Sequence, residues 1–208
     1  MLVFIIEIIG TVAFASSGAM VGIRKKMDIF GVIVMAVMTA VGGGIIRDLV
    51  LGIHPPNTFK DPIYVEYSVA TAVILFVIFY IRKQMLDSKA MFYYERIMIH
   101  LDAIGLGAFT VIGVETAYEI GFVHHRFLLL FVGVITGVGG GMIRDMMAQQ
   151  IPFILVKQIY ACASLIGAGV CIWLMPYHKS ASMILGAVVV VIIRILAATY
   201  RWDLPKID

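Results

Sequence analysis

The sequence has few charged residues for its length. Only 14% of its 208 residues are Asp, Glu, Lys or Arg, whereas 62% are hydrophobic, and the mean hydropathy is +1.01. A soluble domain has about 25% charged and about 45–50% apolar residues, because it must cover its surface with polar groups. The composition therefore excludes a soluble enzyme, a disordered chain and a basic nucleic-acid-binding domain. It indicates an all-α integral membrane protein.

Cysteine is also scarce, and no cluster of His or Cys suggests a metal site. The two cysteines, Cys162 and Cys171, are nine residues apart on one predicted helix, so they cannot form a disulfide with each other there. We expect both to be packing residues, and we expect no catalytic residue, no cofactor and no enzyme activity. The first basic residue is Arg24, so the positively charged start of a cleavable signal peptide is not evident.

Long apolar runs fill most of the chain. A membrane-spanning helix needs about 20 such residues. The runs are continuous rather than alternating apolar and polar, which argues against the strands of a β-barrel. We predict seven transmembrane helices, at residues 2–23, 29–51, 62–81, 97–117, 127–148, 152–175 and 182–200.

The loops between these runs predict the orientation in the membrane. Basic loop residues gather on the cytoplasmic side of membrane proteins. One side carries nine of them: Arg24, Lys25, Lys26, Arg82, Lys83, Lys89, Arg96, Arg201 and Lys206. The other side carries three: Lys60, Arg126 and Lys179. We therefore expect the N-terminus outside the cell and the C-terminus in the cytoplasm.

The chain contains an internal repeat. The segment VGGGIIRD at residues 41–48 recurs as VGGGMIRD at residues 138–145, an offset of 97 residues. The same offset relates Gly10 to Gly107, Phe30 to Phe127, Thr39 to Thr136, Pro55 to Pro152 and Tyr80 to Tyr177. We predict a single membrane domain, residues 1–208, made of one repeat at 2–83, a second at 97–175 and an extra helix at 182–200. Because each repeat has three spans, the second is inverted, which is typical of transport proteins. Duplication without a transport pathway is the alternative.

A glycine triplet lies near the middle of the second predicted helix and another near the middle of the fifth: Gly42, Gly43 and Gly44, and Gly139, Gly140 and Gly141. Consecutive glycines destabilise a helix, so we predict that both helices are kinked or broken there. The carbonyls freed in this way would have to face protein or a water-filled pore, where they could coordinate a cation. Close packing of helices through small residues is the alternative.

An Arg-Asp pair follows each triplet: Arg47 and Asp48, then Arg144 and Asp145. Charges inside a membrane span are costly and normally face a wet cavity or a partner. Neighbouring side chains on a helix point about 100° apart, so we do not expect either arginine to bond to its own neighbouring aspartate. The inverted repeat puts the two pairs in opposite halves of the membrane, so we do not expect direct pairing between the repeats. They could be pore charges or structural counter-ions, and both roles stay open.

Sorting the remaining charges by depth predicts an acidic outer vestibule and a mildly basic inner one. The outer half contains Glu7, Glu66 and Glu115 beside the first Arg-Asp pair, and acidic groups concentrate cations. The inner half contains Asp102, Lys157 and Arg194 beside the second pair. Lys157 could be a pore charge or could extend to the membrane surface, and we expect Arg194 to extend to that surface.

The paired GGG-x-x-R-D elements, the three-plus-three-plus-one arrangement and the chain length resemble the prokaryotic trimeric intracellular cation (TRIC) channels, a family that also carries a glycine-transporter label. The resemblance implies a homotrimer with one pore in each protomer, permeation of K⁺ and also Na⁺, and glycine kinks that shape the pore. The animal members carry Lys-Glu-Val at the site of the first repeat, and this chain does not. Their lipid or calcium regulation and their organelle location are therefore not carried over.

These features together predict a monovalent-cation channel in a bacterial plasma membrane, with lipids as neighbours and no nucleic-acid partner. A secondary transporter of glycine or another small zwitterion is the alternative, because broken helices and paired opposite charges also suit such a substrate. A trimeric scaffold without conduction is a third possibility.

Overall fold

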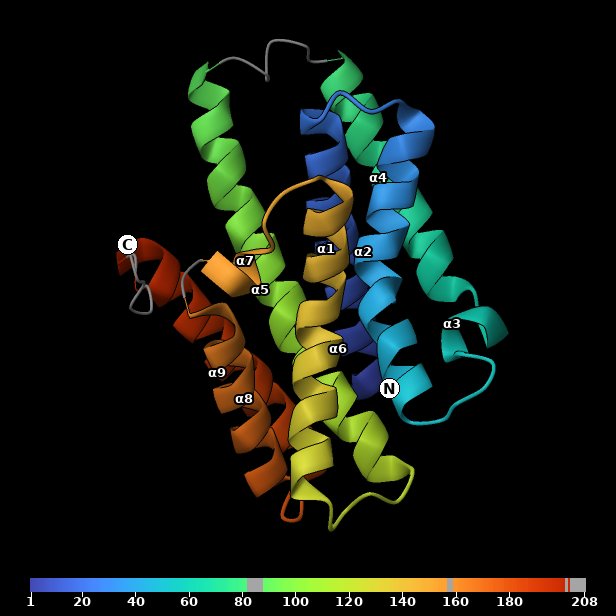
Figure 1. The fold of residues 1–208 in the computed structure, drawn as a ribbon, viewed down its shortest axis with the longest axis vertical. Coiled ribbons are helices and arrows are strands. Elements are labelled where there is room, and N and C mark those ends of the chain that lie inside the picture. Colours follow the sequence, from blue (N-terminus) through green and yellow to red (C-terminus); the bar gives the residue numbers. More distant parts are fainter. Residues whose placement is uncertain (82–87, 157–158, 201, 203–208) are drawn as a thin grey trace.

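The computed structural model describes residues 1–81, 88–156, 159–200 and 202, and its regular structure there is entirely helical (Figure 1). The elements in order are α1 (Leu2–Arg24), α2 (Ile29–Val50), α3 (Asn57–Lys60), α4 (Ile63–Ile81), α5 (Ser88–Glu119), α6 (Arg126–Met147), α7 (Phe153–Val156), α8 (Tyr160–Leu174) and α9 (Lys179–Tyr200). In this part of the chain, six helices are long and apolar enough to cross a membrane: α1, α2, α4, α6, α9 and the Arg96–Glu119 part of α5. The chain is a multi-pass membrane protein, as its composition predicts.

The sixth predicted span, residues 152–175, differs from the prediction. It is divided into the short α7 and the 15-residue α8. A helix of that length is about 22 Å long, less than the hydrocarbon core of about 30 Å. Ile159, the residue before α8, has a left-handed φ of 48°, a conformation that interrupts a right-handed helix. Seven full-length spans therefore remain a prediction.

Helices α1 to α4 and helices α5 to α8 follow the same order along the chain, but the second group runs in the opposite direction to the first. Figure 1 shows α1 running away from the end of the bundle that holds the N-terminus, whereas α5 runs toward that end. The ends of α1 and α5, Arg24 and Glu119, are 95 residues apart, and the starts of α2 and α6, Ile29 and Arg126, are 97 apart. The loop at 120–125 is two residues longer than the loop at 25–28, which accounts for the difference.

This change of offset corrects one pairing made from the sequence. At an offset of 95, Gly10 on α1 corresponds to Gly105 on α5 rather than to Gly107, and Phe14 corresponds to Phe109. The contacts agree with this register. Gly10 lies against Phe109, Gly105 lies against Phe14, and the two rings have their centroids 5.3 Å apart. Two equivalent phenylalanines thus meet where α1 crosses α5.

The glycine triplets lie where α2 crosses α6. An added Cβ at Gly43 would overlap the carbonyl oxygen of Thr136, and one at Gly140 would overlap the carbonyl oxygen of Thr39. The two contacts are equivalent under the offset of 97. Both helices continue through their triplets without interruption, so the predicted break is wrong, and close packing through small residues is what the structure shows. A bend at the triplets stays a prediction.

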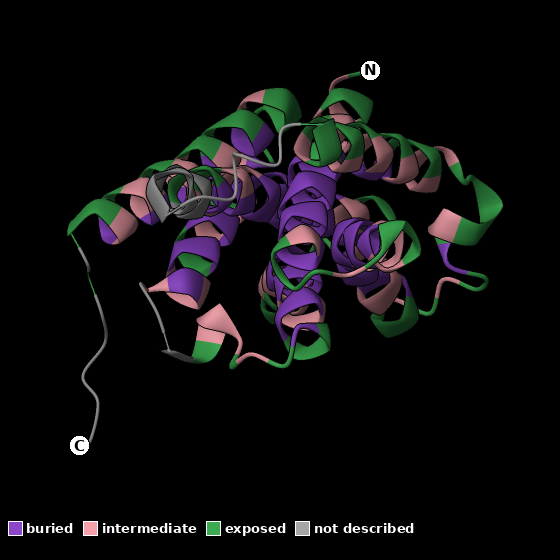
Figure 2. Cartoon of the chain, turned by 90° about the horizontal axis from the view of Figure 1, so that it is seen from above, coloured by how far each residue is buried: buried purple, intermediate pink, exposed green. Residues whose placement is uncertain are grey.

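The remaining long helices surround these crossings. Helix α4 packs on α1 and α2, while α9, which has no counterpart in the first half, packs on α5 and α8. Figure 2 shows buried residues in the middle of the bundle and exposed residues around it. Exposed apolar side chains such as Phe30, Phe127 and Trp173 are normal on a surface that faces lipid.

Candidate functional site

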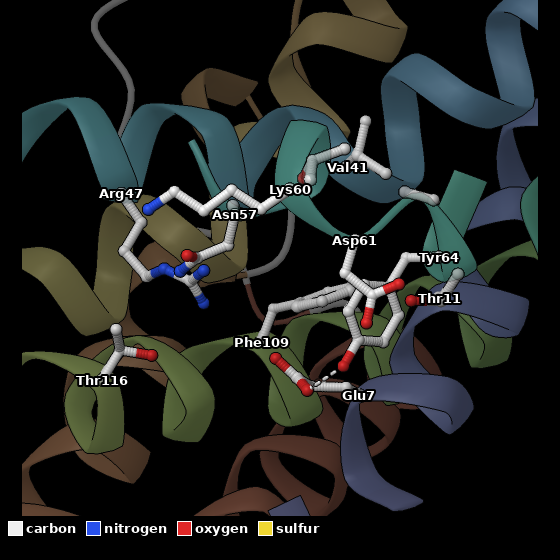
Figure 3. A pocket seen from close by; sticks show the side chains of 13 residues that line it. Glu7, Thr11, Val41, Arg47, Asn57, Lys60, Asp61, Tyr64, Phe109 and Thr116 are labelled. Carbon is white, nitrogen blue, oxygen red and sulfur yellow. Dashed lines mark hydrogen bonds between the residues drawn. The ribbon is translucent and has the colours of Figure 1, made fainter. Parts of the chain in front are cut away.

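A polar cavity of about 320 Å³ opens between the first helices of the bundle, in the half of the molecule that holds the N-terminus. Side chains from α1, α2, α3, α4 and α5 line it, together with Asp61 between α3 and α4 (Figure 3). The lining residues are Glu7, Thr11, Ala40, Val41, Gly44, Arg47, Asn57, Thr58, Lys60, Asp61, Tyr64, Phe109 and Thr116. We call it the polar cavity, and it has room for several water molecules.

Charges of both signs line the polar cavity. Figure 3 shows Arg47 and Lys60 toward one end and Glu7 and Asp61 toward the other, and Glu7 accepts a hydrogen bond from the hydroxyl of Tyr64. The sequence predicts an acidic vestibule that includes Arg47; the cavity also contains Lys60, so charges of opposite sign lie at its two ends.

Only one of the three predicted vestibule acids lines this cavity. Glu7 does, but Glu66 is exposed on α4 and lies outside the lining. Glu115 is buried, and its Oε1 lies 2.7 Å from Nζ of Lys179 at the start of α9. Glu115 therefore ties α5 to α9.

The first Arg-Asp pair bonds to itself, contrary to the expectation from the sequence. Nε of Arg47 donates to Oδ1 of Asp48 at 2.8 Å. The Cβ directions do diverge, but the three-carbon stem of arginine is long enough to turn the guanidinium back. Oδ2 of Asp48 accepts from the backbone N–H of Asn57 at 2.7 Å, so this carboxylate also holds the first residue of α3.

The second pair repeats this arrangement. Nε of Arg144 donates to Oδ1 of Asp145 at 2.8 Å, and Oδ2 of Asp145 accepts from the N–H of Phe153, the first residue of α7, at 3.0 Å. Each Asp thus joins the end of a long helix to the short helix that follows. This shared bonding gives both Arg-Asp pairs a structural role.

Around Arg144 lies a buried group that we call the ionic cluster: Ser17, Asp102, Arg144, Asp145, Tyr160 and Arg194. Nη1 of Arg144 donates to Oδ1 of Asp102 at 2.6 Å and to Oγ of Ser17 at 2.5 Å. Arg144 has no exposed surface, and Asp102 is 1% exposed. Two arginines and two aspartates balance each other here, which is how a membrane interior tolerates charge.

Arg194 corrects another expectation. It does not reach the membrane surface: its guanidinium carbon lies 4.5 Å from the ring centroid of Tyr160, and its Nη2 lies 3.9 Å from Oδ2 of Asp102. The carboxylate and the aromatic face attract the cation inward. Lys157, the other predicted inner cation, lies outside the described residues.

One glycine of the first triplet lines the polar cavity, and one glycine of the second triplet lies beside the ionic cluster. Gly44 lines the polar cavity, and an added Cβ there would meet nothing closer than Nη2 of Arg47 at 3.9 Å. Gly141 lies beside the ionic cluster, where an added Cβ would stand 2.9 Å from the hydroxyl oxygen of Tyr160. The other four glycines lie where α2 and α6 cross: Gly42, Gly43, Gly139 and Gly140.

Sequence reasoning missed Ser17, Tyr64 and Tyr160. The tyrosines are 96 residues apart, as are the starts of α3 and α7, so a repeat search that allowed the offset to change would have paired them. The resulting first-half set is Glu7, Arg47, Asp48 and Tyr64. The equivalent second-half set is Asp102, Arg144, Asp145 and Tyr160.

The residues that the structure describes contain no group of three or more His, Cys, Asp or Glu that could hold a metal ion. Cys162 and Cys171 are both free thiols. What the arrangement offers instead is a polar cavity with carboxylates at one end and, in the other half, a buried ionic cluster.

Comparison with known proteins follows the same division of the chain. A family model described as glycine transporter matches residues 4–80 and 99–176. The UPF0126 inner membrane protein YadS of Escherichia coli (strain K12) is 39% identical over 213 residues, covering 99% of this chain and 96% of that protein.

Solved structures share the whole architecture. A prokaryotic TRIC channel crystallised in 0.5 M KCl has a TM-score of 0.88 at 34% identity, covering 98% of this chain and 99% of the other. The TRIC trimeric intracellular cation channel orthologue from Rhodobacter sphaeroides has a TM-score of 0.84 at 31% identity, covering 95% and 97%. Both similarities extend over essentially the full bundle, including α9.

Proposed function

The chain belongs to the prokaryotic TRIC family of membrane proteins, and from this membership we propose that it is a cation channel that conducts K⁺ and Na⁺ through a hydrated pore within each protomer. The observation that carries the proposal is the polar cavity, which enters the bundle from the side that holds the N-terminus. Water in such a cavity lowers the cost of bringing an ion into the membrane.

We propose a path for the ion that begins at the polar cavity and ends at the ionic cluster. A cation enters the polar cavity near Glu7 and Asp61, passes the crossings where Phe14 meets Phe109 and Gly43 meets Thr136, and leaves past the ionic cluster. The carboxylates at the cavity end attract the cation. The small residues at the crossing of α2 and α6 let the two backbones adjust without side chains in the way.

The wider setting follows the family. We propose a homotrimer in a bacterial plasma membrane, with the N-terminus outside and the C-terminus in the cytoplasm, as the distribution of basic loop residues predicts. The two inverted repeats, 2–83 and 97–175, form opposite ends of one pore, and helix 182–200 completes the bundle. Glycine transport is the weaker assignment, because the matching structures that cover the whole chain are channels.

Reconstitution tests the proposal. Purified protein in liposomes is expected to release K⁺ down its gradient and to give unitary currents in planar bilayers, with no change when glycine is added. Liposomes without protein are the control. Saturable uptake of labelled glycine without unitary currents would contradict the channel.

A further inference from the structure

Arg47 brings hydrogen-bond donors into the polar cavity that no described residue uses. Its Nε donates to Oδ1 of Asp48, and in the part of the chain that the structure describes the guanidinium has no other hydrogen-bond or ion-pair partner. The two terminal nitrogens, Nη1 and Nη2, are therefore available to a ligand. Arg47 is 6% exposed and lines the cavity, so this charge lies in an enclosed polar space (Figure 3). A buried guanidinium with unused donors attracts an anion.

The equivalent arginine of the second repeat shows which kind of anion fits. Arg144 bonds to its neighbour Asp145 as Arg47 bonds to Asp48. Arg144 also donates from Nη1 to Oδ1 of Asp102 at 2.6 Å. One arginine thus holds two carboxylates, the first from the next residue and the second from another helix. The same Arg-Asp arrangement in the first repeat leaves the guanidinium ready for a second carboxylate.

The first repeat does not provide that second carboxylate from its own chain. At the offset of 95, Glu7 corresponds to Asp102. Glu7, however, accepts a hydrogen bond from the hydroxyl of Tyr64 and lies toward the other end of the cavity (Figure 3). The place beside Arg47 is left to a molecule from solution.

A second acceptor is also missing beside Arg47. Nη1 of Arg144 donates to Oγ of Ser17 at 2.5 Å. At the offset of 95, Ser17 corresponds to Ile112, which is buried and has no side-chain acceptor. Both partners of the second arginine therefore lack a counterpart that binds the first.

The balance of charge leads to the same ligand. In the ionic cluster, the cations Arg144 and Arg194 lie against two carboxylates. The cationic end of the polar cavity also has two cations, Arg47 and Lys60, but among the described residues only the carboxylate of Asp48 bonds to either. One further carboxylate would give both places the same balance.

This end of the cavity can be reached from solution. Lys60 and Asn57 are exposed, and Figure 3 shows both near Arg47. The side-chain amide of Asn57 can donate to an anion there. The cavity volume of about 320 Å³ leaves room for a small organic anion together with water.

We propose that Arg47 and Lys60 form a binding site for a small carboxylate such as acetate, which takes the role that Asp102 has beside Arg144. The guanidinium offers Nη1 and Nη2 to the two carboxylate oxygens, Lys60 adds a second positive charge, and Asn57 adds a donor. The binding does not depend on the proposed channel. Its effect on conduction does: the bound anion makes the cavity more negative, which concentrates cations.

Thermal unfolding of the purified protein in detergent tests the binding, with acetate as the probe. Acetate is expected to raise the unfolding temperature in a saturable way, because a ligand that binds the folded state stabilises it. Acetamide, which has a similar shape and no charge, and chloride at the same ionic strength are expected to have no such effect. An equal rise with chloride would overturn the assignment to a carboxylate. No rise with acetate would show that water alone occupies the donors, and would overturn the site.

Lys60→Gln tests the site at an exposed position where the fold is not at risk. It is expected to raise the acetate concentration at half-saturation about fivefold, the upper range for an ion pair with an exposed partner. Lys60→Arg keeps the charge and is expected to restore the original value. Lys25→Gln, which changes an exposed lysine after the other end of α1, is the matched control. Equal half-saturation in the Lys60→Gln and Lys25→Gln variants would overturn the proposal.

Arg47→Lys tests the geometry of the site. It keeps one positive charge but loses the pair of terminal nitrogens that matches a carboxylate, so acetate binding is expected to weaken at least about tenfold. Unchanged binding would contradict the role of the guanidinium. If this variant does not fold, the comparison of Lys60→Gln with Lys60→Arg decides.

K⁺ flux in liposomes gives the readout that depends on the channel. Saturating acetate is expected to raise the flux about twofold at low ionic strength, because it adds a negative charge to the cavity. Glycine is expected to leave the flux unchanged, since its ammonium offsets its carboxylate. Acetate binding without K⁺ flux in any variant would refute the channel and support the site. Flux that does not respond to bound acetate would overturn the proposed effect on conduction.

Discussion

Gly43 of α2 and Gly140 of α6 face each other across the crossing of their helices: a Cβ at position 43 would stand 3.3 Å from the backbone nitrogen of Gly140. The same Cβ would overlap the carbonyl oxygen of Thr136. An added Cβ at Gly140 would likewise overlap the carbonyl oxygen of Thr39. The triplets therefore bring two backbones together in the middle of the membrane. Only residues without a side chain let the two backbones come this close, so the triplets determine how α2 and α6 pack.

Gly43→Ala is expected to destabilise the protein because the added methyl group forces α2 away from α6. Overpacking of a tight contact costs about 1–3 kcal/mol, so thermal unfolding in detergent should occur at a lower temperature. Gly44→Ala is the control, since a Cβ there meets nothing closer than 3.9 Å. Equal unfolding temperatures in the two variants would show that the crossing is not tight.

Glu7→Gln is expected to lower K⁺ conductance about twofold to tenfold at low ionic strength, because the cavity loses a charge that concentrates cations. Glutamine can still accept the hydrogen bond from Tyr64. The effect should fade near 1 M salt, where the Debye length is about 3 Å. Glu66→Gln, outside the cavity, is expected to leave conductance unchanged. A loss of conductance that persists at high salt would contradict an electrostatic role.

Asp102→Asn is expected to lower the free energy of unfolding by about 3–5 kcal/mol, because two buried arginines then share one carboxylate. Chemical unfolding in detergent, followed by circular dichroism, measures the change. Asp28→Asn is the matched control: Asp28 is an exposed N-cap of α2, and asparagine caps a helix equally well. A change as small as that of the control would mean that the ionic cluster does not stabilise the fold.

Glu115→Gln is expected to reduce stability by about 1 kcal/mol and to leave conductance unchanged, because Glu115 pairs with the half-exposed Lys179 rather than lining the cavity. Glu119→Gln, which changes the more exposed partner of the same lysine, should have a smaller effect. Thermal unfolding and bilayer currents provide the two measurements. A salt-dependent loss of current in the Glu115→Gln variant would contradict this prediction and show that Glu115 lies on the conduction path.

Hydropathy and repetition along the chain were enough to predict a helical membrane protein, the positions of most long helices and an inverted duplication. These properties depend on the cost of exposing polar backbone or charge to lipid, which can be read residue by residue. The repeat also located Arg47, Asp48, Arg144 and Asp145 before any contact was known.

The hydrogen-bond and ion-pair partners of the charged side chains could not be predicted in this way. They depend on which helices touch and on how far a flexible side chain reaches. Arg194 was expected at the membrane surface, but packing of α9 on α5 brings it within 3.9 Å of Asp102, where opposite charges attract strongly in a medium of low dielectric constant. Ser17 had no distinguishing pattern along the chain. It matters because the fold places it 127 residues away in sequence and 2.5 Å away in space from Arg144, while its counterpart at position 112 is an isoleucine.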